Sequence, residues 1–413
     1  MQATTKAPKT LLWISVMLFL TVQTTLAQTR IAVMSDIHVT SKATPAGDRK
    51  MLDKSRVIFD RLVSQFRTQK PNLLLVTGDL TEDGDIENHQ YVKAGLDKLK
   101  AAGVKAFVIP GNHDLKTLDE DGFKTMYADY GYGAASAKDS TSLSYACEPV
   151  KGLTLIGIDS HEGMLSGKTL NWVCHQAEEA RSKGHQVIAM MHHPLFPHFN
   201  NADLFISTST ISNYENVRNK LADAGIRIIL TGHFHTSDIA KDWNEDLSHE
   251  IYDINTGSAI SYPCDYRLLT LNSDRSVINV MTKHIDTLPG EAAFAKMAKS
   301  RLYTSMYEKA YQKLASRFSF TESEKKLLAG IAARAFIVHA EGNEGSKAHE
   351  EAVGQIFQDI DRISNGDNTL IKMAMTYLRP TFESILKDIS NYGDPDRENC
   401  TDDLTLSITI PVK

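Results

Sequence analysis

Residues 226–236 read IRIILTGHFHT, an apolar run that ends at Gly232 and is followed by two histidines one residue apart, His233 and His235. A continuous run rich in isoleucine is typical of a strand that is buried on both faces. Because side chains alternate in direction along a strand, we expect the two histidines to point to the same side. Two histidines at this spacing are also an ordinary polar surface, so the pair indicates a site only if other segments supply partners.

Strands of this kind recur along the chain and alternate with amphipathic stretches. Helical periodicity is clearest over residues 54–69 and 87–103, and the second stretch ends at Gly103, as helices often do. Buried strands that alternate with helices predict an α/β fold. The predicted strands are RIAVMSD (30–36), NLLLVTGD (72–79), KAFVIPGN (105–112), LTLIGIDS (153–160), QVIAMMHH (186–193) and IRIILTGH (226–233).

Three later β-rich runs follow one another without helices between them, which predicts an antiparallel addition within a second sheet. These runs are EIYDINTG (250–257), YRLLTLN (266–272) and SVINVMTKH (276–284). The last residues, CTDDLTLSITIPVK (400–413), return to alternating β character, and we expect them to pair back onto a sheet.

Between the run at residues 276–284 and the last β segment, at residues 400–413, the sequence pattern is helical. Pro289 and Gly290 mark a boundary, after which long helical patterns continue to about residue 390. We therefore expect an α/β domain at residues 28–286 and a mainly α-helical C-terminal domain at residues 287–413. Helical periodicity leaves open whether this domain caps a site, mediates dimerisation or packs on a sheet edge.

Residues 1–27 have the features of an export signal. Lys6 and Lys9 precede the apolar run LLWISVMLFLTV (11–22), which is short for a membrane span and is followed by small residues up to Ala27. We expect cleavage there and an exported protein, periplasmic or extracellular, without a transmembrane span. An uncleaved anchor is the alternative, although no stop-transfer pattern follows the run.

The charge balance limits the partners of the mature chain. The whole sequence has a formal net charge of −6, and removal of the two lysines within residues 1–27 changes it to −8. A mildly acidic protein is a poor candidate for gripping bulk DNA or RNA, or for a broad basic membrane-binding face. We expect any local cationic site to come from something other than lysine and arginine.

The four cysteines do not indicate a metal or redox motif. They are far apart and form no C-x-x-C pair, which argues against a zinc knuckle and a thioredoxin-type site. Disulfides and buried free thiols both remain open, and the three pairings of four cysteines cannot be separated. The residues are Cys147, Cys174, Cys264 and Cys400.

Acidic, amide and imidazole side chains stand at the ends of five predicted strands. Each has an ordinary explanation alone, because Asp or Asn there caps a helix or forms a turn and His there lies on the surface. Five such ends at one edge of one sheet are typical of a ligand site, and donors without thiolate fit manganese, iron, zinc or cobalt. The segments are Asp36-Ile37-His38, Gly78-Asp79, Gly111-Asn112-His113-Asp114, His192-His193-Pro194 and Gly232-His233-Phe234-His235.

These segments resemble the signature of the calcineurin-like metallophosphoesterases, which runs D-x-H, GD, GNH[DE], H and GHxH. All elements occur in order, and the resemblance covers about residues 30 to 284. It implies a four-layer α-β-β-α sandwich of two mixed sheets with flanking helices, to which the mainly helical C-terminal region is added. It also implies a hydrolase of phosphoester bonds in which a hydroxide that bridges two divalent metal ions attacks phosphorus.

The resemblance further implies two sets of metal ligands. The H-x-P pattern of the family favours His192 over His193 as the ligand from its segment, and His193 is then expected to line the site. The implied ligands are Asp36, His38 and His235 for one ion, Asn112, His192 and His233 for the other, and the carboxylate of Asp79 as the bridge between both.

Two divalent ions outweigh two carboxylates and a hydroxide in charge, so the implied centre attracts a phosphate ester by itself. Such a pair of ions lowers the pKa of water and clamps the attacking and leaving oxygens. His113 is then the candidate that protonates the leaving alkoxide, and Asp114 is expected to hold its ring in the right tautomer. A helix N-cap is a second and compatible role for Asp114.

The sequence around the motifs narrows the choice of subfamily. The segments GDLTEDG and GNHD lack the arginines of protein Ser/Thr phosphatases. Glu82 stands where purple acid phosphatases have an iron-binding tyrosine. The motifs most resemble the branch of class III cyclic-nucleotide phosphodiesterases and glycerophosphodiesterases. We expect a small phosphoester substrate of the nucleotide, glycerophosphodiester or lipid headgroup class. A metal-stabilised binding or scaffold protein with a vestigial site and a nuclease are the alternatives.

Two loops contain candidates for substrate specificity. The loop MMHHPLFPHFNN follows the fifth strand in this set, and its His198 is either a substrate contact or a solvated loop histidine. From the resemblance to the family, a second loop, GSAISYPCDYR, is expected to form another wall of the site. The candidates are His193, His198 and Asn200 in the first loop and Tyr262, Pro263 and Cys264 in the second.

Overall fold

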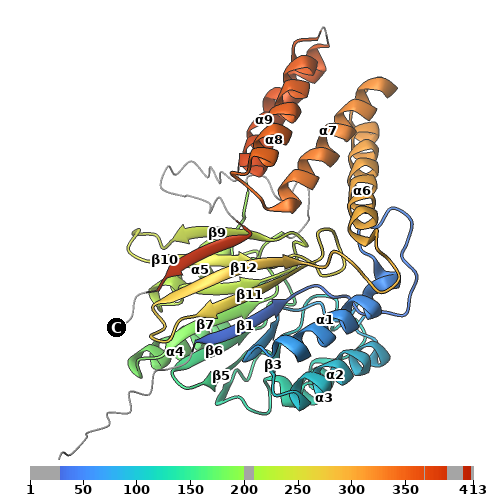
Figure 1. Ribbon diagram of the computed structural model, residues 1–413. Coiled ribbons are helices and arrows are strands. Elements are labelled where there is room, and N and C mark those ends of the chain that lie inside the picture. The colour runs from blue at the N-terminus through green and yellow to red at the C-terminus, as the bar shows by residue number, and fades with distance from the viewer. Residues whose placement is uncertain (1–27, 200–208, 367, 388–402, 411–413) are drawn as a thin grey trace, which may run out of the picture.

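The computed structural model describes residues 28–199, 209–366, 368–387 and 403–410, so the predicted export signal lies outside the described residues. Two mixed β-sheets face each other, and helices cover the outer face of each sheet (Figure 1). This is the predicted four-layer α-β-β-α sandwich. A bundle of helices from the C-terminal part of the chain rises from one end of it.

The first sheet joins a parallel half to an antiparallel half, in the order β13-β12-β11-β1-β2-β3. The first three strands in sequence run parallel to one another, whereas β11, β12 and β13 extend the sheet from β1 in antiparallel pairs. The strands are β1 (Thr29–Met34), β2 (Leu73–Val76), β3 (Lys105–Val108), β11 (Asp265–Leu271), β12 (Val277–His284) and β13 (Thr405–Thr409).

The second sheet has the order β4-β5-β6-β7-β8-β10-β9. Its centre, β6 to β8 and then β10, is parallel, and both edges are antiparallel. The strands are β4 (Ala137–Lys138), β5 (Tyr145–Val150), β6 (Leu153–Ile158), β7 (Gln186–Met191), β8 (Ile228–Thr231), β9 (Asp238–Trp243) and β10 (Glu250–Asn255).

Alternation along β7 shows how this sheet is buried on both faces. Ile188 and Met190 belong to the core that includes the first sheet, whereas Val187, Ala189 and Met191 belong to the core under the outer helices. A strand with apolar side chains on both faces reads as a continuous apolar run. This burial explains why β7 and β8 are among the clearest strands in the sequence.

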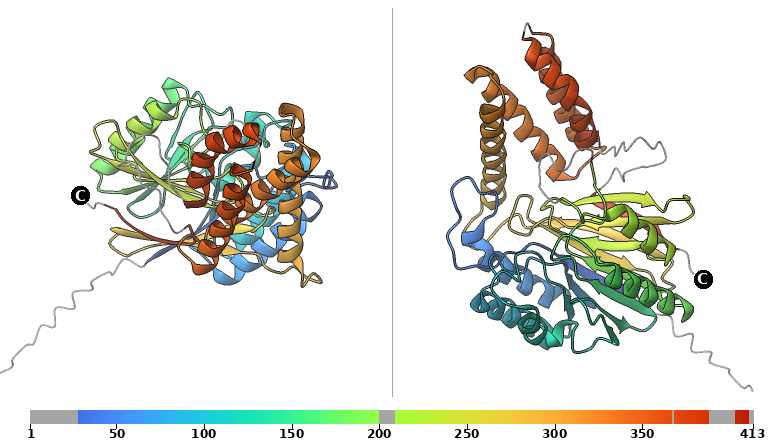
Figure 2. Two further views of the ribbon diagram at one scale, coloured as in Figure 1. Left: turned by 90° about the horizontal axis from the view of Figure 1, so that it is seen from above. Right: turned by 180° about the vertical axis from the view of Figure 1, so that it is seen from behind.

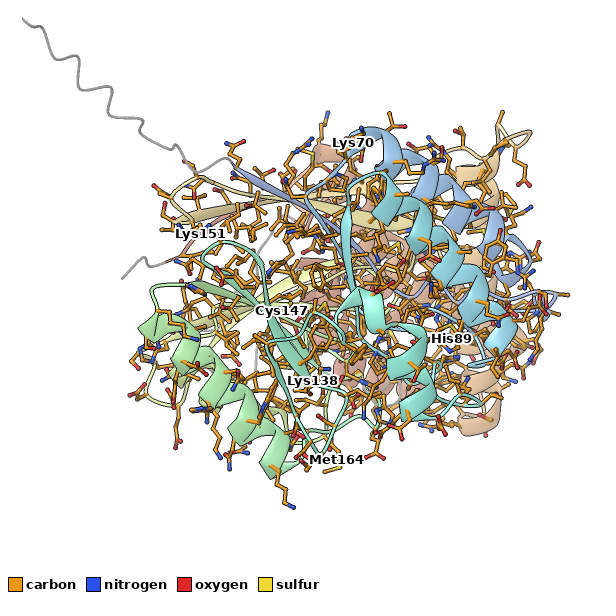
Figure 3. All side chains as sticks on the ribbon, turned by 90° about the horizontal axis from the view of Figure 1, so that it is seen from below. Lys70, His89, Lys138, Cys147, Lys151 and Met164 are labelled. Atoms are coloured by element: carbon orange, nitrogen blue, oxygen red, sulfur yellow. The ribbon has the colours of Figure 1, made fainter. Side chains whose placement is uncertain are left out.

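Helices form the two outer layers where the sequence has an apolar stripe. In α1 the buried residues Ile58, Leu62 and Phe66 recur every four positions, and the helix ends at Lys70 with a left-handed φ of 47°. Seen from below, α2 and α4 lie on opposite sides of Cys147 of β5 (Figure 3). The helices are α1 (Ser55–Gln69), α2 (Ile86–Ala101), α3 (Glu120–Met126), α4 (Gly167–Ser182) and α5 (Tyr214–Asp223), with 3-10 turns η1 (Leu52–Lys54) and η2 (Ala128–Tyr130).

The C-terminal helices form a bundle with an apolar cluster of their own. Leu328, Ile356 and Phe382, from three different helices, meet in this cluster. A capping box between Thr321 and Glu324 starts the second helix of the bundle. Figure 2 shows the bundle from two further sides. Its helices are α6 (Phe294–Arg317), α7 (Glu322–Glu341), α8 (Lys347–Ser364) and α9 (Thr369–Lys387).

Aromatic contacts connect this bundle to the sandwich. Phe199 and Phe234, from loops that follow β7 and β8, lie 5.3 Å apart between ring centroids and cluster with Ile385 of α9. The Tyr262 hydroxyl, expected to form a wall of the site, donates to Glu341 of α7 at 2.7 Å. The helical region therefore packs on the loops at the carboxyl ends of the central strands.

A fully buried arginine joins strands of both sheets. Arg267 of β11 donates from Nη1 to the Asp403 carbonyl at 2.8 Å and from Nη2 to the Asn255 carbonyl at 2.7 Å. Asp403 in turn accepts from the backbone N–H of Ile239 at 2.6 Å through its carboxylate. Through these bonds the residues just before β13 are linked to β9 and β10 of the second sheet.

The fold corrects part of the strand analysis. The three later runs were expected together in an antiparallel addition to a second sheet, but β10 pairs parallel with β8 whereas β11 and β12 join β1 in the first sheet. Runs without intervening helices can return to either sheet, because pairing depends on distant partners. The expected return of the last residues to a sheet is confirmed by β13. The edge strands β4 and β9, and β5 next to β4, were not predicted.

Two further predictions from the sequence can be compared with the described part of the chain. Its cysteines, Cys147, Cys174 and Cys264, form no disulfide with one another, and Cys400 lies outside it. None of its helices has the length and apolar character needed to cross a membrane.

Candidate metal centre

The predicted ligand segments come together at the carboxyl ends of strands from both sheets. The segments after β1, β2 and β3 belong to the first sheet, and those after β7 and β8 belong to the second. The expectation that all five lie at one edge of one sheet is therefore wrong. The edges of two facing sheets meet instead, so the ligands surround the site from two sides.

Four buried side chains form the first group, in which His38 and His235 face each other. Their Nε2 atoms are 3.2 Å apart. Asp36 Oδ1 lies 3.2 Å from His235 Nε2 and, among the described residues, receives no hydrogen bond of regular geometry. Two facing imidazole nitrogens beside a buried carboxylate oxygen are ligand atoms arranged around the place of a cation. The group consists of Asp36, His38, Asp79 and His235.

The second group is arranged in the same way. His192 Nε2 and His233 Nδ1 lie 3.3 Å apart, and Asn112 Oδ1 is 3.1 Å from each of these nitrogens. Imidazole and amide oxygen donors are the types that borderline divalent ions accept. The group that can hold an ion consists of Asp79, His192 and His233, with Asn112 as its amide neighbour.

Asp79 belongs to both groups. Its Oδ2 atom lies 3.5 Å from His38 Nε2 and also 3.5 Å from His192 Nε2. Its Oδ1 atom accepts a hydrogen bond from the backbone N–H of His113 at 2.8 Å, which fixes the carboxylate in this orientation. One carboxylate is thus equidistant from a histidine of each group.

The backbone of the ligand segments is unusual. Five candidate ligands have a left-handed φ, between 40° and 70°, which non-glycine residues adopt at a cost of about 1–3 kcal/mol each. His233 and His235 are among them and lie beyond the end of β8, so the expected strand alternation does not direct their side chains. The five residues are Asp36, His38, Asp79, His233 and His235.

Gly232 is required for close approach of two of these segments. A Cβ atom at this position would lie 1.9 Å from Ser35 Oγ and 2.7 Å from Asp36 Oδ2. Asp36 Oδ2 instead accepts a hydrogen bond from the backbone N–H of His233 at 2.8 Å. The glycine therefore brings the loop after β8 against the loop after β1.

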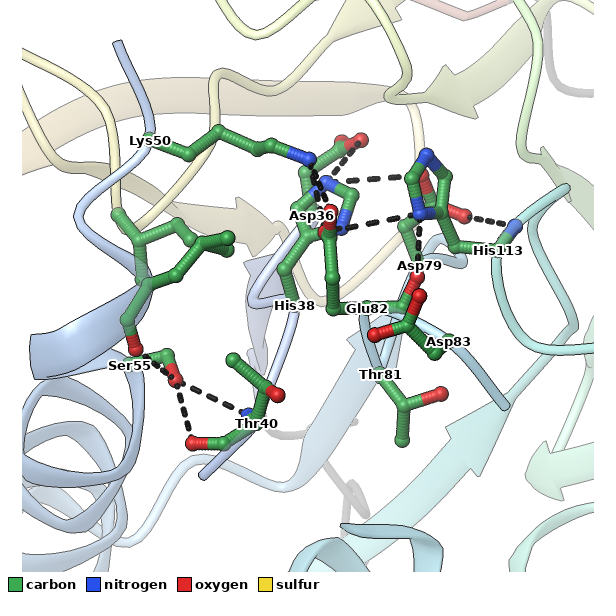
Figure 4. A network of polar contacts seen from close by, with 12 residues as sticks. Asp36, His38, Thr40, Lys50, Ser55, Asp79, Thr81, Glu82, Asp83 and His113 are labelled. Carbon is green, nitrogen blue, oxygen red and sulfur yellow. Dashed lines mark hydrogen bonds and ion pairs between the residues drawn. The ribbon is translucent and has the colours of Figure 1, made fainter. Parts of the chain in front are cut away.

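Two neighbouring groups orient the histidines. Glu82 Oε2 lies 2.8 Å from His38 Nδ1, and the Glu82 carboxylate also accepts from Lys50 Nζ at 2.7 Å (Figure 4). On the other side of the site, His192 Nδ1 lies 2.8 Å from the Thr77 carbonyl. Each contact occupies Nδ1 and leaves Nε2 directed at Asp79, as in metal sites where a second group fixes the histidine. This role of Glu82 was not predicted from the sequence, where the residue stood out only because purple acid phosphatases have a tyrosine at this position.

The charges of the site favour bound cations. Burial would raise the pKa of Asp79 and of Asp36, but the surrounding histidines hold both pKa values well below the usual range. Burial would likewise lower the pKa of His192, whereas the carboxylates of Asp79 and Asp36 raise it to about 9. Buried, ionised carboxylates of this kind need a positive partner, and a divalent ion can take the place of a proton on the histidines.

His113 and Asp114 differ from the prediction in one respect. His113 Nδ1 lies 2.5 Å from the Glu82 carbonyl and 2.7 Å from Lys116 Nζ, and its ring stands edge-on to that of His38 at 4.7 Å. The Asp114 carboxylate accepts from the backbone N–H groups of residues 80, 81 and 111 and does not reach the His113 ring. The expectation that Asp114 orients that ring is wrong, because its oxygens are committed to the two loops.

The loop after β7 also departs from expectation. His193 is buried with its ring 4.2 Å from that of His233, and burial is the main reason why its pKa is well below the usual value. His198 is neither solvated nor placed as a substrate contact: it is 4% exposed, with Nδ1 3.0 Å from Asp238 and Nε2 3.2 Å from Asp253. Asn200 lies outside the described residues.

A cationic pocket beside the first group was not expected. It has a volume of about 480 Å³ and is lined by Arg49, Lys50 and Lys309, by one acidic residue, Asp48, and by His235. The expectation that a local cationic site would not come from lysine or arginine is therefore wrong. Net charge of the whole chain carries no information about the few side chains that the fold gathers at one place.

Comparisons with known proteins agree on one family. The sequence profile described as calcineurin-like phosphoesterase matches residues 29–237. A probable cyclic nucleotide phosphodiesterase of Synechococcus sp. strain WH7803 is 25% identical over 217 residues, which cover 50% of this chain and 74% of that protein. A probable glycerophosphodiester phosphodiesterase, GpdQ, of Arcobacter nitrofigilis is 26% identical over 212 residues, covering 49% of this chain and 70% of its own.

Among solved structures, a dimetal phosphatase from Danio rerio aligns with 62% of this chain and 96% of its own at a TM-score of 0.46 and 13% identity. This likeness is too weak to add to the family assignment.

Proposed function

Because the chain belongs to the calcineurin-like phosphoesterase family and is a hydrolase of phosphoester bonds, we propose that it cleaves small phosphodiesters with the help of two divalent metal ions. The observation that carries this proposal is the position of Asp79, whose Oδ2 is 3.5 Å from a histidine of each ligand group. A pair of such ions supplies Lewis acidity and activates water for attack on phosphorus.

The ligand assignment of the proposal follows the two groups. Imidazole nitrogens that face each other at 3.2 and 3.3 Å, and a buried carboxylate oxygen without a regular hydrogen bond, fit divalent cations. Manganese, iron, zinc and cobalt all suit this donor set. We assign Asp36, His38 and His235 to one ion, Asn112, His192 and His233 to the other, and Asp79 to both.

The protein's own groups supply proton transfer and orientation. His113 is 20% exposed in its side chain and stands beside the first group, with Nδ1 engaged by the Glu82 carbonyl. Because Nδ1 is occupied by its neighbours, Nε2 is the atom left to donate a proton to the leaving oxygen. Lys116 Nζ lies 2.7 Å from Nδ1 and donates to the Glu82 carbonyl at 3.2 Å, so its positive charge stands beside the ring and favours release of this proton.

Diesters are preferred over monoesters in this proposal because both relatives named above are probable phosphodiesterases. The substrate classes that follow are cyclic nucleotides and glycerophosphodiesters. The test is hydrolysis of bis(p-nitrophenyl) phosphate and p-nitrophenyl phosphate with added manganese. We expect faster turnover of the diester, and loss of turnover with a chelator and in Asp79→Asn. Activity that survives both treatments would remove the metal ions from the mechanism.

The cellular location is a separate proposal that rests on the sequence of residues 1–27, outside the described residues. Their basic start, short apolar run and small residues support export and cleavage after Ala27. N-terminal sequencing of the protein purified from its native host tests this, and a chain that retains residues 1–27 contradicts it.

A further inference from the structure

The cationic pocket lies between the sandwich and the C-terminal helical bundle. The loop after β1 forms one wall, α6 contributes Lys309 to another, and His235 of the first ligand group borders the pocket. Gly47 in this loop lies close to α6, since a Cβ atom there would be 2.8 Å from Glu308 Oε2 at the end of that side chain. The lining residues are Pro45 to Lys50, His235 and Lys309.

The positively charged side chains that line the pocket differ in their interaction partners. Lys50 is bound to Glu82 at 2.7 Å and so belongs to the network that orients His38. Arg49 donates to the Phe234 carbonyl at 3.3 Å, and its guanidinium lies 5.9 Å from the centre of the Phe336 ring. In the described part of the chain neither Arg49 nor Lys309 lies within ion-pair distance of a carboxylate, although Asp48 also lines the pocket and acts on both cations through space.

The contacts of Arg49 hold its guanidinium in place. The Phe234 carbonyl belongs to the residue between His233 and His235, and Phe336 lies on α7 of the bundle. The arginine therefore connects the ligand loop to the helical region while it remains only partly buried. A guanidinium that is positioned by neutral contacts and forms no direct ion pair keeps donor groups for a ligand.

We propose that this pocket binds a second anionic group of the substrate, a phosphate or a carboxylate, while the scissile phosphate lies at the metal centre. Arg49 and Lys309 are the residues that recognise this group, and the C-terminal helical region contributes to specificity through α6. The inference rests on the proposed function, since it takes the scissile phosphate to lie beside His235.

Two matched substrates separate this inference from the proposed function. Thymidine 5′-(p-nitrophenyl phosphate) and its 3′-phosphorylated counterpart differ by one phosphate group, and each releases p-nitrophenolate on cleavage of the aryl ester. The measured quantity is the ratio of their kcat/KM values with manganese present. We expect the wild-type protein to favour the 3′-phosphorylated substrate through a lower KM.

The variants are Lys309→Ala, Lys309→Glu and Arg49→Gln. Lys309 is exposed on α6, so its replacement leaves the fold intact. We expect Lys309→Ala to lower the preference about 3- to 10-fold, as for loss of one partly exposed charge contact, and Lys309→Glu to lower it further. Lys296→Ala, which removes an exposed lysine of the same helix outside the pocket, is the control and should keep the preference.

The outcomes are distinct. If both substrates are cleaved and no pocket variant changes the preference, the inference is wrong and the metal mechanism stands. An equal rise of KM for both substrates in Lys309→Ala also contradicts it, because the pocket would then contact a part that they share. If the wild-type protein cleaves neither substrate nor bis(p-nitrophenyl) phosphate, the proposed function itself fails.

Discussion

The Glu82 carboxylate lies 2.8 Å from Nδ1 of His38, on the side of the imidazole ring away from Asp79. This contact sets a carboxylate against Nδ1 and leaves Nε2 facing the first ligand group. Burial would raise the pKa of Glu82, but the bonds from His38 and Lys50 lower it to about 2, so the carboxylate is ionised at neutral pH. An ionised carboxylate also makes the ring a stronger donor to a metal ion.

Replacement of Glu82 by Gln is therefore expected to weaken metal binding at the first group. The amide keeps the size of the side chain but loses the charge, and changes of this kind cost about 10- to 100-fold in metal affinity. Calorimetric titration with manganese measures the effect. Glu87→Gln, which removes only an exposed partner of Arg56, is the control and should bind the metal as the wild-type protein does. Unchanged affinity in Glu82→Gln would contradict the orienting role.

A methyl group at Gly232 is expected to abolish activity. In Gly232→Ala the new Cβ atom meets Ser35 and Asp36 at 1.9 and 2.7 Å, so either Asp36 or the loop of His233 must move. Misplacement of a ligand by about 1 Å costs on the order of 100-fold in rate. Turnover of bis(p-nitrophenyl) phosphate is the measurement. Gly167→Ala is the control and should retain full activity, because the space around its Cβ position is open. Full activity in both variants would contradict this explanation.

His198 is expected to stabilise the fold in a pH-dependent way. Burial would lower its pKa, but the carboxylates of Asp238 and Asp253 raise it to about 10, above an ordinary value of 6.5. A raised pKa in the folded state means that the stabilisation is complete below about pH 6.5 and is lost as the pH rises through about 10. Removal of the ring in His198→Gln leaves two buried carboxylates unpaired and should cost about 3–5 kcal/mol at neutral pH.

Urea unfolding at several pH values tests this expectation. The free energy of unfolding of the wild-type protein should approach that of His198→Gln as the pH rises from about 7 to about 10. His185→Gln, which affects a histidine 3.8 Å from the half-exposed side chain of Glu148, is the control. A stability difference that stays constant over this range would show that the imidazolium does not supply the stabilisation.

Arg267 is expected to matter for stability rather than for chemistry. Its guanidinium donates to the main-chain carbonyls of Asn255 and Asp403 in the interior, so Arg267→Met leaves buried acceptors unsatisfied at a cost of about 3 kcal/mol or more. Arg30→Met is a matched control, because Arg30 also donates to two main-chain carbonyls but is exposed. Thermal unfolding separates the two, and an equal effect of both variants would contradict the role of burial.

The sequence predicts the strands and the ligands well where local pattern determines them. Strands such as β7 and β8 are continuous apolar runs because both faces are buried, and the ligands stand directly after strand ends. Strands whose apolar run is interrupted are not found in this way. β5 contains Glu148 and Pro149, and the edge strand β9 contains Asp238, Lys241 and Asp242, so neither has a continuous apolar pattern. Local pattern also does not predict which sheet a strand joins, because β11 pairs with β1 across more than two hundred residues.

The details of the site that were missed depend on tertiary contacts. Glu82 follows Asp79 by three residues, so its proximity to the ligand loops was foreseeable, but its contact with His38 required the pairing of β1 with β2. The role given to Asp114 was wrong because loop amides compete for its oxygens. The cationic pocket forms where the loop after β1 meets α6, a helix whose role periodicity alone did not define.

The central claim is that two metal ions share Asp79, and metal stoichiometry tests it most directly. Elemental analysis and calorimetric titration of the manganese-loaded protein should give two ions per chain, with hydrolysis of bis(p-nitrophenyl) phosphate appearing as the second ion binds. In Asp79→Asn the second ion should be lost together with this hydrolysis. A wild-type protein that binds one ion or none at full activity, or an Asp79→Asn variant that retains both ions and full turnover, would contradict the claim.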